Sequence, residues 1–284
     1  KGNKSVGVGH QYCGNVGKTA NSQVAVFGCL CNGQYASLVD GRLYLPASWV
    51  SDEARCHGAG IPESERVFKT KQELAVDIIK HQLAMGIAFD YVGADGLYGN
   101  DAAFAREIDK LGLVYVFDIH SDQQVYLEKP ELYLPERKTT KGPAPKKLKA
   151  STEAIPTCEY IKALESSHWK KIDIRHSAKG VLKGLFHFKT VYIWDKNTNR
   201  IEERLLVVSK RKAKNGEEIK YSFSNASLVQ YSEQAVAYMQ AQRFFIEHSF
   251  KEQKQILGMD QFQTRKWLSW YHQVALNLMV GCFM

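Results

Sequence analysis

The segment RFFIEHSFKEQK, residues 243–254, carries one acid between two bases on a single expected helix face. Because an α-helix turns by about 100° per residue, Arg243, Glu247 and Lys254 lie within roughly 60° of one another. Glu247 also stands among phenylalanines, and a carboxylate in apolar surroundings is costly unless a cation or a metal ion pairs with it. The segment therefore favours an anion or metal site. The alternative is an ordinary Arg243–Glu247 ion pair on a solvated face.

A second carboxylate, Asp95, ends an apolar strand in FDYVGADGLYG, residues 89–99. Ligands gather at the carboxyl ends of strands in open α/β sheets. The small neighbours of Asp95 leave room for another group to approach its carboxylate. The alternative is that Asp95 only caps the helix that begins near Asn100. Asp118 in VFDIH also lies near a strand end, but its neighbours are bulky, and we assign it a structural role.

Two further motifs fail the requirements of the chemistry that they suggest. The GKT at residues 17–19 suggests a phosphate loop, but Tyr12 stands where the required glycine belongs, and a strand follows instead of a helix. Cys29 and Cys31 share one strand face and residues 56–57 add a Cys-His pair, yet no second pair has zinc-like spacing. We therefore expect buried thiols in a reducing compartment.

The elements that must position these residues belong to a basic, globular chain. With 284 residues and 44% hydrophobic content, the chain can bury a substantial core. Thirty-eight Lys and Arg against thirty Asp and Glu give a net charge of +8, which favours polyanionic partners. There is no apolar run of about 18 residues and no leader peptide, so we expect a cytoplasmic protein. A start without Met and an end inside an apolar run predict a fragment.

The first part of the chain alternates β-rich and helical segments. Residues 22–33 and 34–46 are β-rich and meet at Asn32-Gly33, which predicts an antiparallel hairpin. The periodicity then predicts a helix over 69–86, a strand running into a turn over 89–99, a helix over 101–112 and a strand over 113–119. Helix, strand, helix, strand predicts a parallel α/β layer.

The character of the chain changes near Ser121. Residues 135–149 hold six basic residues and one acidic residue among prolines and glycine, which predicts a solvated loop. Three short β-like segments follow, over 181–196, 200–212 and 218–225, with turns at Asn197 to Asn199 and at Asn215-Gly216. A long helix is then predicted from about Ser232 to Gly258, and another helical segment from Thr264 onward.

These residues resemble the insertion-sequence transposases of the DDE (Asp-Asp-Glu) superfamily, in the branch with a Tyr-Arg-Glu-Lys signature. Arg243, Glu247 and Lys254 meet the pattern of Arg, three residues, Glu, six residues and Lys. The blocks SVGVGHQYCG, NSQVAVF, LYLPASW, GADGLYG and ILGMDQF, with RKW and YHQVAL, also resemble the family, so the likeness covers nearly the whole chain.

Two positions depart from the family pattern. Gln240 stands where the signature has its tyrosine, and the nearest tyrosine is Tyr238. The first aspartate of the triad would lie on a strand just before Lys1. Asp40, which we place in the turn before LYLP, is a poor substitute. We therefore expect the chain as given to be catalytically inactive.

The resemblance implies a ribonuclease-H-like α/β core that is interrupted by a β-rich insertion. The first part of the core would comprise residues 1–120, the insertion residues 121–225 and the C-terminal helical part of the core residues 226–284. The implied activity is metal-dependent cleavage of phosphodiester bonds at transposon ends, followed by strand transfer to target DNA. The partner would be double-stranded DNA, with a homodimer as one arrangement on it, at the nucleoid of a bacterial cytoplasm.

Asp95 and Glu247, with the upstream aspartate, are the metal ligands that the resemblance implies. Such cleavage is served by two Mg²⁺ or Mn²⁺ ions about 3.5 to 4 Å apart, and hard cations prefer carboxylate oxygens. A shared site requires the Asp95 and Glu247 carboxyls to converge. Arg243 and Lys254 would grip phosphates beside the scissile bond.

The basic residues of the insertion add candidate DNA contacts. Lys210 and Arg211, in the segment over 209–214, would bind phosphates. Trp194 and Trp169 are candidates for stacking on an unpaired base, although an anchoring role in a β-core is more common for tryptophan. Two rival functions remain: a transposase remnant that holds DNA without cutting it, and a structure-selective nuclease that cuts branched DNA.

Overall fold

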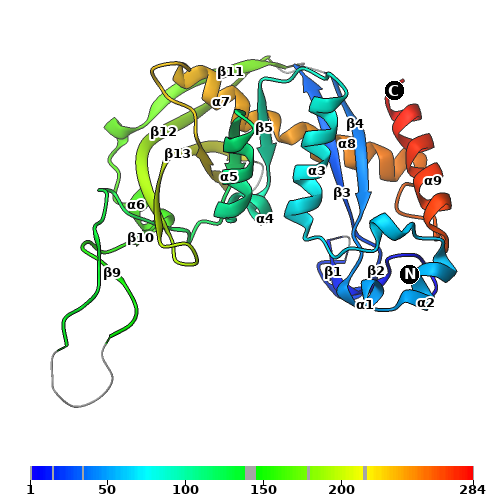
Figure 1. Ribbon diagram of the computed structural model, residues 1–284. Coiled ribbons are helices and arrows are strands. Elements are labelled where there is room, and N and C mark those ends of the chain that lie inside the picture. Colours follow the sequence, from blue (N-terminus) through cyan, green and yellow to red (C-terminus); the bar gives the residue numbers. More distant parts are fainter. Residues whose placement is uncertain are drawn as a thin grey trace. The chain divides into compact units, whose positions relative to one another are not determined.

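The computed structural model describes residues 2–14, 16–33, 35–137, 145–177, 180–213 and 216–283. The chain forms two compact units (Figure 1). The first unit contains Lys1–Ala88 and Gln242–Met284, and the second contains Phe89–Ala241. Each unit has its own hydrophobic core. None of the helices in the described part of the chain is both long and apolar enough to span a membrane.

Two antiparallel hairpins open the first unit. They are formed by β1 (Gly9–Cys13) with β2 (Lys18–Ser22) and by β3 (Ala25–Asn32) with β4 (Tyr35–Leu43). The second hairpin confirms the prediction, but Asn32 still pairs with Tyr35, so the turn begins one residue later, at Gly33. Gly33 has a φ of 64°, a conformation that glycine adopts without strain. Gln34 lies outside the described residues.

The first unit also contains helices. They are α1 (Ala47–Val50), α2 (Glu53–Ala59), the 3₁₀ turn η1 (Glu63–Glu65), α3 (Lys71–Ala84), α8 (Phe244–Leu257) and α9 (Trp267–Gly281). Of these, α3, α8 and α9 pack against the hairpin of β3 and β4. The predicted α3 is confirmed, and Thr70 and Glu73 form a capping box at its start. Phe27 on β3 contacts Phe250 of α8 and Trp270 of α9, with ring centroids 5.7 and 6.4 Å apart. The C-terminal helices therefore cover the hairpin.

The predicted single helix from Ser232 to Gly258 is wrong. The chain forms α7 (Glu233–Gln242) and then α8, with a turn at Arg243 between them. The physical reason is that the two helices serve different cores: Val236 and Ala237 of α7 are fully buried in the second unit, whereas Ser249 and Gln253 of α8 are buried in the first. The helical segment predicted from Thr264 is confirmed as α9.

A six-stranded mixed sheet forms the second unit, in the order β11-β12-β13-β14-β6-β5. Its strands are β5 (Tyr91–Ala94), β6 (Val114–Asp118), β11 (Lys170–Ser177), β12 (Gly180–Asp195), β13 (Arg200–Ala213) and β14 (Gly216–Ser224). β5 and β6 are parallel, as predicted, and the other pairs are antiparallel. The three predicted β segments are confirmed as β12, β13 and β14 with bounds within two residues of those predicted, and β11 was not predicted.

The strands of the insertion extend the same sheet that carries Asp95. Ser222, Phe223 and Ser224 of β14 pair with Asp118, Phe117 and Val116 of β6. Figure 1 shows the long strands β12 and β13 bending around α7. α4 (Gly96–Gly99) and α5 (Ala102–Lys110) connect β5 to β6. This α/β architecture, a curled mixed sheet with helices, is consistent with the predicted ribonuclease-H-like class with a β-rich insertion.

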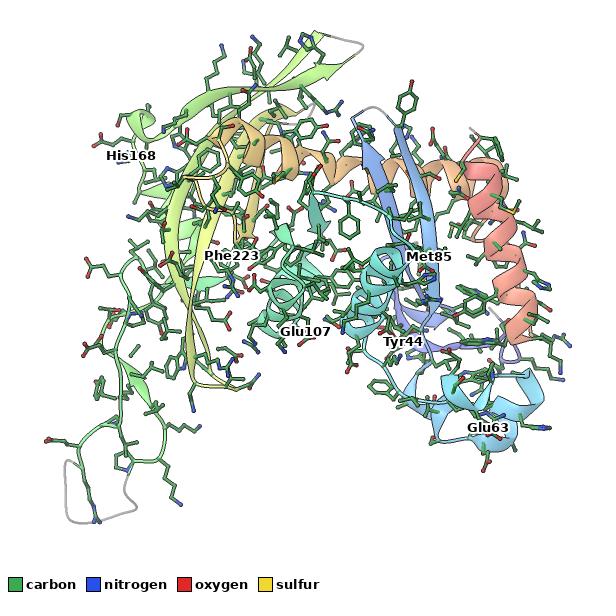
Figure 2. The ribbon with its side chains drawn as sticks, turned by 45° about the horizontal axis from the view of Figure 1, so that its top comes forward. Tyr44, Glu63, Met85, Glu107, His168 and Phe223 are labelled. Carbon is green, nitrogen blue, oxygen red and sulfur yellow. The ribbon has the colours of Figure 1, made fainter. Side chains whose placement is uncertain are left out.

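Both faces of the sheet are buried. One face packs Phe186 and Val207 against α7, and the other packs Leu206 and Phe223, which is labelled in Figure 2, against Ile161. Ile161 belongs to α6 (Thr157–Lys162), within short elements that also comprise β7 (Gln124–Val125), β8 (Leu132–Tyr133), β9 (Lys149–Ala150), β10 (Ile155–Pro156) and η2 (Ser166–His168). Residues 138–144 of the predicted loop and Asn215 of the predicted turn lie outside the described residues.

Candidate active site

Asp95 lies at the carboxyl end of β5, where it is exposed and precedes α4. Its Oδ1 accepts a hydrogen bond of 2.9 Å from the backbone N–H of Leu97, so Asp95 is the N-cap of α4. Among the described residues, Asp95 has no further hydrogen bond or ion pair through its side chain. Its Oδ2 is therefore available to a ligand from solvent.

Asp95 is a helix cap, as the alternative predicts, but the helix that it caps is not the predicted one. Asp95 caps α4, a helix that the sequence did not predict, whereas α5 is capped by Asp101. Oδ1 of Asp101 accepts from the N–H groups of Ala103 and Phe104 at 2.8 and 3.1 Å. Capping occupies one oxygen of Asp95, so a structural role and a ligand-binding role are compatible in this residue.

The glycines of the Asp95 motif serve a tight contact with the end of β6. A Cβ atom on Gly99 would lie 1.9 Å from the carbonyl oxygen of Asp118, and one on Gly96 would lie 2.8 Å from Cδ2 of His120. That the small neighbours of Asp95 admit another group to its carboxylate stays a prediction. Gly96 and Gly99 admit the end of β6 and the residues after it, and this contact fixes α4 and the carboxylate at its start.

Asn100 links α4 to the residues after β6. Its Nδ2 donates a hydrogen bond of 2.6 Å to the carbonyl of Gly96, and its Oδ1 accepts one of 3.3 Å from the backbone N–H of His120. Tyr98 of α4 packs against Phe104 of α5, with ring centroids 5.3 Å apart. Burial, and secondarily the charge of Asp95, raise the pKa of Tyr98, so its hydroxyl stays protonated near neutral pH.

Asp118 has a structural role. Its Oδ1 accepts a hydrogen bond of 2.8 Å from the hydroxyl of Ser222. That hydroxyl accepts one of 3.0 Å from Nε2 of Gln240, which also donates to the carbonyl of Val207 at 3.2 Å. Gln240 is only 3% exposed. The residue at the tyrosine position of the signature therefore holds α7 against the sheet, inside the core.

Glu247 on α8 is paired with Arg243, as the solvated-face alternative requires. Nη1 of Arg243 lies 2.8 Å from Oε1 of Glu247, whose side chain is 57% exposed. The expected apolar environment of Glu247 is wrong, because its side chain is largely exposed while the nearby Phe250 ring packs toward Phe27. Lys254 is half-buried, and its Nζ lies 5.8 Å from the ring centroid of Phe250. Glu247 keeps an oxygen toward solvent.

Asp40 is a structural carboxylate. It lies within β4, so its predicted place in a turn is wrong, and its side chain is 9% exposed. Its Oδ1 accepts from the N–H of Gly41 at 2.8 Å. Its Oδ2 lies 2.6 Å from Nδ1 of His81 and accepts from Arg42 and Gln82 at 3.3 and 3.2 Å. These neighbours occupy both oxygens.

Lys210 and Arg211 do not form one patch, because successive side chains of a strand point to opposite faces. Nζ of Lys210 lies 4.1 Å from the ring centroid of Trp169. Arg211, 17% exposed, lies 4.0 Å from Glu218 on the neighbouring strand. Trp194 is half-buried, with Nζ of Lys196 at 5.6 Å from its ring. Lys214 lies outside the described residues.

Sequence reasoning missed His120 and Asn100. Both lie at the corner where α4 meets the end of β6, next to Asp95. The only sequence signal for His120 was its position after the predicted strand that ends in VFDI, because ligands gather at the carboxyl ends of strands. Nothing in the sequence showed that α4 would turn back onto this strand end.

In the described part of the chain, no three His, Cys, Asp or Glu side chains come together as a metal site. Asp95 belongs to the second unit and Glu247 to the first, so their convergence stays a prediction. Both present solvent-facing carboxylate oxygens, which are the donors that Mg²⁺ and Mn²⁺ prefer. The two residues therefore fit divalent cations in their chemistry.

The second unit is an α/β unit with an exposed carboxylate at a strand end, which is consistent with the ribonuclease-H-like class. The family model of the DDE superfamily endonucleases matches residues 1–181, and the chain belongs to that family. The matched residues include Asp95 and end before α8. These endonucleases generally use divalent metal ions.

A relative from an insertion sequence gives a second comparison. The "Probable transposase for insertion sequence element IS701" of Microchaete diplosiphon is 34% identical to this chain over 128 residues. The match covers 44% of this chain and 30% of the length of the relative. The predicted resemblance to insertion-sequence transposases of the DDE superfamily is thus confirmed.

Proposed function

We propose that this chain is part of a DNA transposase that cuts phosphodiester bonds at the ends of its element and joins those ends to target DNA. The observation that carries the proposal is the state of Asp95. Its carboxylate is exposed, held by a cap and a packed corner, and open at Oδ2 among the described residues. A pre-positioned carboxylate in a DDE endonuclease has the chemistry of a metal ligand.

Asp95 and Glu247 are the proposed ligands of Mg²⁺ or Mn²⁺, in a site of two ions. When bound, the ions supply an activated water and stabilise the leaving oxygen. Arg243 orients Glu247 through their 2.8 Å ion pair, and its guanidinium would contact the phosphate backbone beside the cut. Lys254, on the same helix, would add a second phosphate contact. We propose that a third carboxylate comes from an aspartate on a strand that precedes Lys1.

The insertion is the proposed source of further DNA contacts. Lys210 lies over the Trp169 ring, so a base or sugar that reached Trp169 would also meet a positive charge. Arg211 on β13 and Trp194 on β12 are further proposed DNA contacts. In this proposal the core comprises residues 1–120 and 226–284, and residues 121–225 are the insertion. The whole protein would act on double-stranded DNA, as a homodimer in one arrangement, at the nucleoid of a bacterial cytoplasm.

The test replaces each proposed ligand in the full-length protein. Asp95→Asn and Glu247→Gln should abolish Mg²⁺-dependent cleavage of a duplex that carries the element's terminal sequence, while binding of that duplex persists. Glu107→Gln is the matched control, because Glu107 is a partly exposed carboxylate on α5 that pairs with Lys110 one turn along the same helix. Cleavage by Asp95→Asn at the wild-type rate would contradict the proposal.

The rival is a remnant that binds DNA without cutting it, and the Arg243–Glu247 pair on a solvated face favours it. Affinity cannot separate the two functions, since both predict salt-sensitive DNA binding. Cleavage assays of the chain 1–284 and of a form extended upstream can. We expect the extended form alone to cut. Absence of cutting by the extended form with Mg²⁺ and with Mn²⁺ favours the remnant, and preferential cutting of branched DNA favours the structure-selective nuclease.

The same assay tests the place of the first acid. Robust cutting by the chain 1–284 that Asp40→Asn abolishes, in a variant shown to be folded, would assign the first acid to Asp40. The four neighbours of the Asp40 carboxylate argue against that outcome.

A further inference from the structure

The imidazole of His120 lies beside Asp95 at the same edge of the sheet. β5 and β6 are parallel neighbours, so their carboxyl ends meet at one edge, where Asp95 follows β5 and His120 follows β6 by two residues. The ring lies directly against Gly96: a Cβ on this glycine would come within 2.8 Å of Cδ2 and 3.1 Å of Nε2 of His120. Gly96 is the residue after Asp95, so the two side chains share one corner.

The surroundings hold His120 in place and leave its ring nitrogens available. Its backbone N–H donates to Asn100, whose amide also binds the carbonyl of Gly96, so the loop after β6 is tied to α4. The residue is exposed. In the described part of the chain, its imidazole makes no hydrogen bond or ion pair. An exposed imidazole on a backbone that is held in place can donate an N–H to an acceptor from outside the protein.

A DNA strand that reaches Asp95 brings such an acceptor. A strand that is cut at the proposed metal ions must lie beside Asp95, and a neighbouring N–H donor can hold its backbone in register. Protein contacts of this kind to phosphate oxygens position a nucleic acid without reading its sequence. His120 supplies an N–H donor within the corner that fixes Asp95.

We propose that His120 binds a non-bridging phosphate oxygen of the DNA strand at the Asp95 site. The inference rests on the proposed function, because it takes the DNA strand at Asp95 as given. It also explains Gly96: this position has an ordinary negative φ, and any side chain there would push the imidazole away. The glycine after Asp95 is therefore needed for the position of His120.

The experiment compares His120→Leu, His120→Asn and Gly96→Ala in the full-length protein. His120→Leu removes the donor, His120→Asn keeps an N–H donor, and Gly96→Ala displaces an unchanged imidazole. The control is His176→Leu, because His176 is an exposed histidine of the same unit on β11. Binding is measured with a duplex of the element's terminal sequence, with Ca²⁺ in place of Mg²⁺, and cleavage is measured with Mg²⁺.

A hydrogen bond to a charged group contributes about ten- to hundredfold to affinity. We expect His120→Leu and Gly96→Ala to weaken binding and cleavage by about that factor, His120→Asn to restore a good part of it, and His176→Leu to have no effect. The second measurement uses duplexes in which one phosphate at a time, at and beside the cleaved bond, is a neutral methylphosphonate. At one position the substitution should weaken the wild type but not His120→Leu, because both changes remove the same contact.

The outcomes separate this inference from the proposed function. If the wild type cleaves, Asp95→Asn does not, and His120→Leu matches the wild type, His120 is not a contact and the function stands. If the losses from methylphosphonate and from His120→Leu add at every position, the role of His120 is structural and the inference is overturned. If Asp95→Asn cleaves as the wild type does, the proposed function itself fails.

Discussion

Gly99→Ala should destabilise the second unit through a single steric contact. The added Cβ would lie 1.9 Å from the carbonyl oxygen of Asp118, so α4 or the end of β6 must move by about 1.5 Å to reach an ordinary contact of 3.4 Å. The backbone φ of Gly99 is not positive, so alanine fits the local conformation and the overlap is the main cost. Overpacking of this kind costs about 1–3 kcal/mol.

Gly93→Ala is the matched control, because Gly93 lies in the same GADGLYG block. A Cβ there would have Val116 O as its nearest neighbour, at 3.9 Å, an ordinary contact. We expect it to be neutral or to stabilise by about 0.5–1 kcal/mol, since glycine weakens a strand.

Urea unfolding gives the global effect. With an m-value of about 1–3 kcal/mol/M, the Gly99→Ala midpoint should fall by roughly 1 M. Hydrogen exchange of peptides that cover β6 and α4 locates the effect. Equal midpoints and equal exchange in the two variants would refute the reasoning that α4 is held against Asp118.

Three further predictions follow from other contacts. Lys254→Ala should weaken binding to any duplex and reduce the slope of log affinity against log salt concentration by about one. An unchanged slope in a salt titration would show that Lys254 does not contact DNA. Asp40→Asn should cost about 1–3 kcal/mol in urea unfolding, because it removes the charged acceptor that His81 and Arg42 contact; an unchanged unfolding midpoint would contradict this. The hydrogen bond from Cys31 lowers the pKa of Cys29, and the same contact raises the pKa of Cys31, so Cys29 should be the more fully ionised thiol near neutral pH. Peptide mass spectra should therefore show that iodoacetamide labels Cys29 before Cys31. Faster labelling of Cys31 would show that Cys31 is the more ionised thiol of the two.

Local patterns predicted most of the elements. The Thr70 to Gly86 segment contains its own capping box and a closing glycine, so α3 depends little on distant residues. The Asn32-Gly33 signal predicted the hairpin, although the paired register moved its turn by one residue. The helix across Arg243 was predicted wrongly, because both halves have helical sequence, and the choice to turn there depends on which core buries each half.

The candidate site was predicted in part. The residue types and spacings of Asp95, Glu247, Arg243 and Lys254 were sufficient to indicate the family, since signature spacing is a property of the sequence. Their environments were not, because burial depends on packing: Glu247 is exposed, and Lys210 and Arg211 lie on opposite faces of one strand.

The sequence by itself determined the α/β class and the strand that presents Asp95, because periodicity and turn residues act over short distances. It placed Glu247 in a helix but not the start of that helix. Only the tertiary structure decided the rest. It showed that strands of the predicted insertion join the sheet of β5 and β6 through Ser222 to Ser224, and that Gly96 and Gly99 pack against the end of β6 and the residues after it. These contacts join residues far apart in the chain, and their fit depends on atomic distances that no local pattern contains. The neighbour of Asp95, His120, is for this reason visible only in the fold.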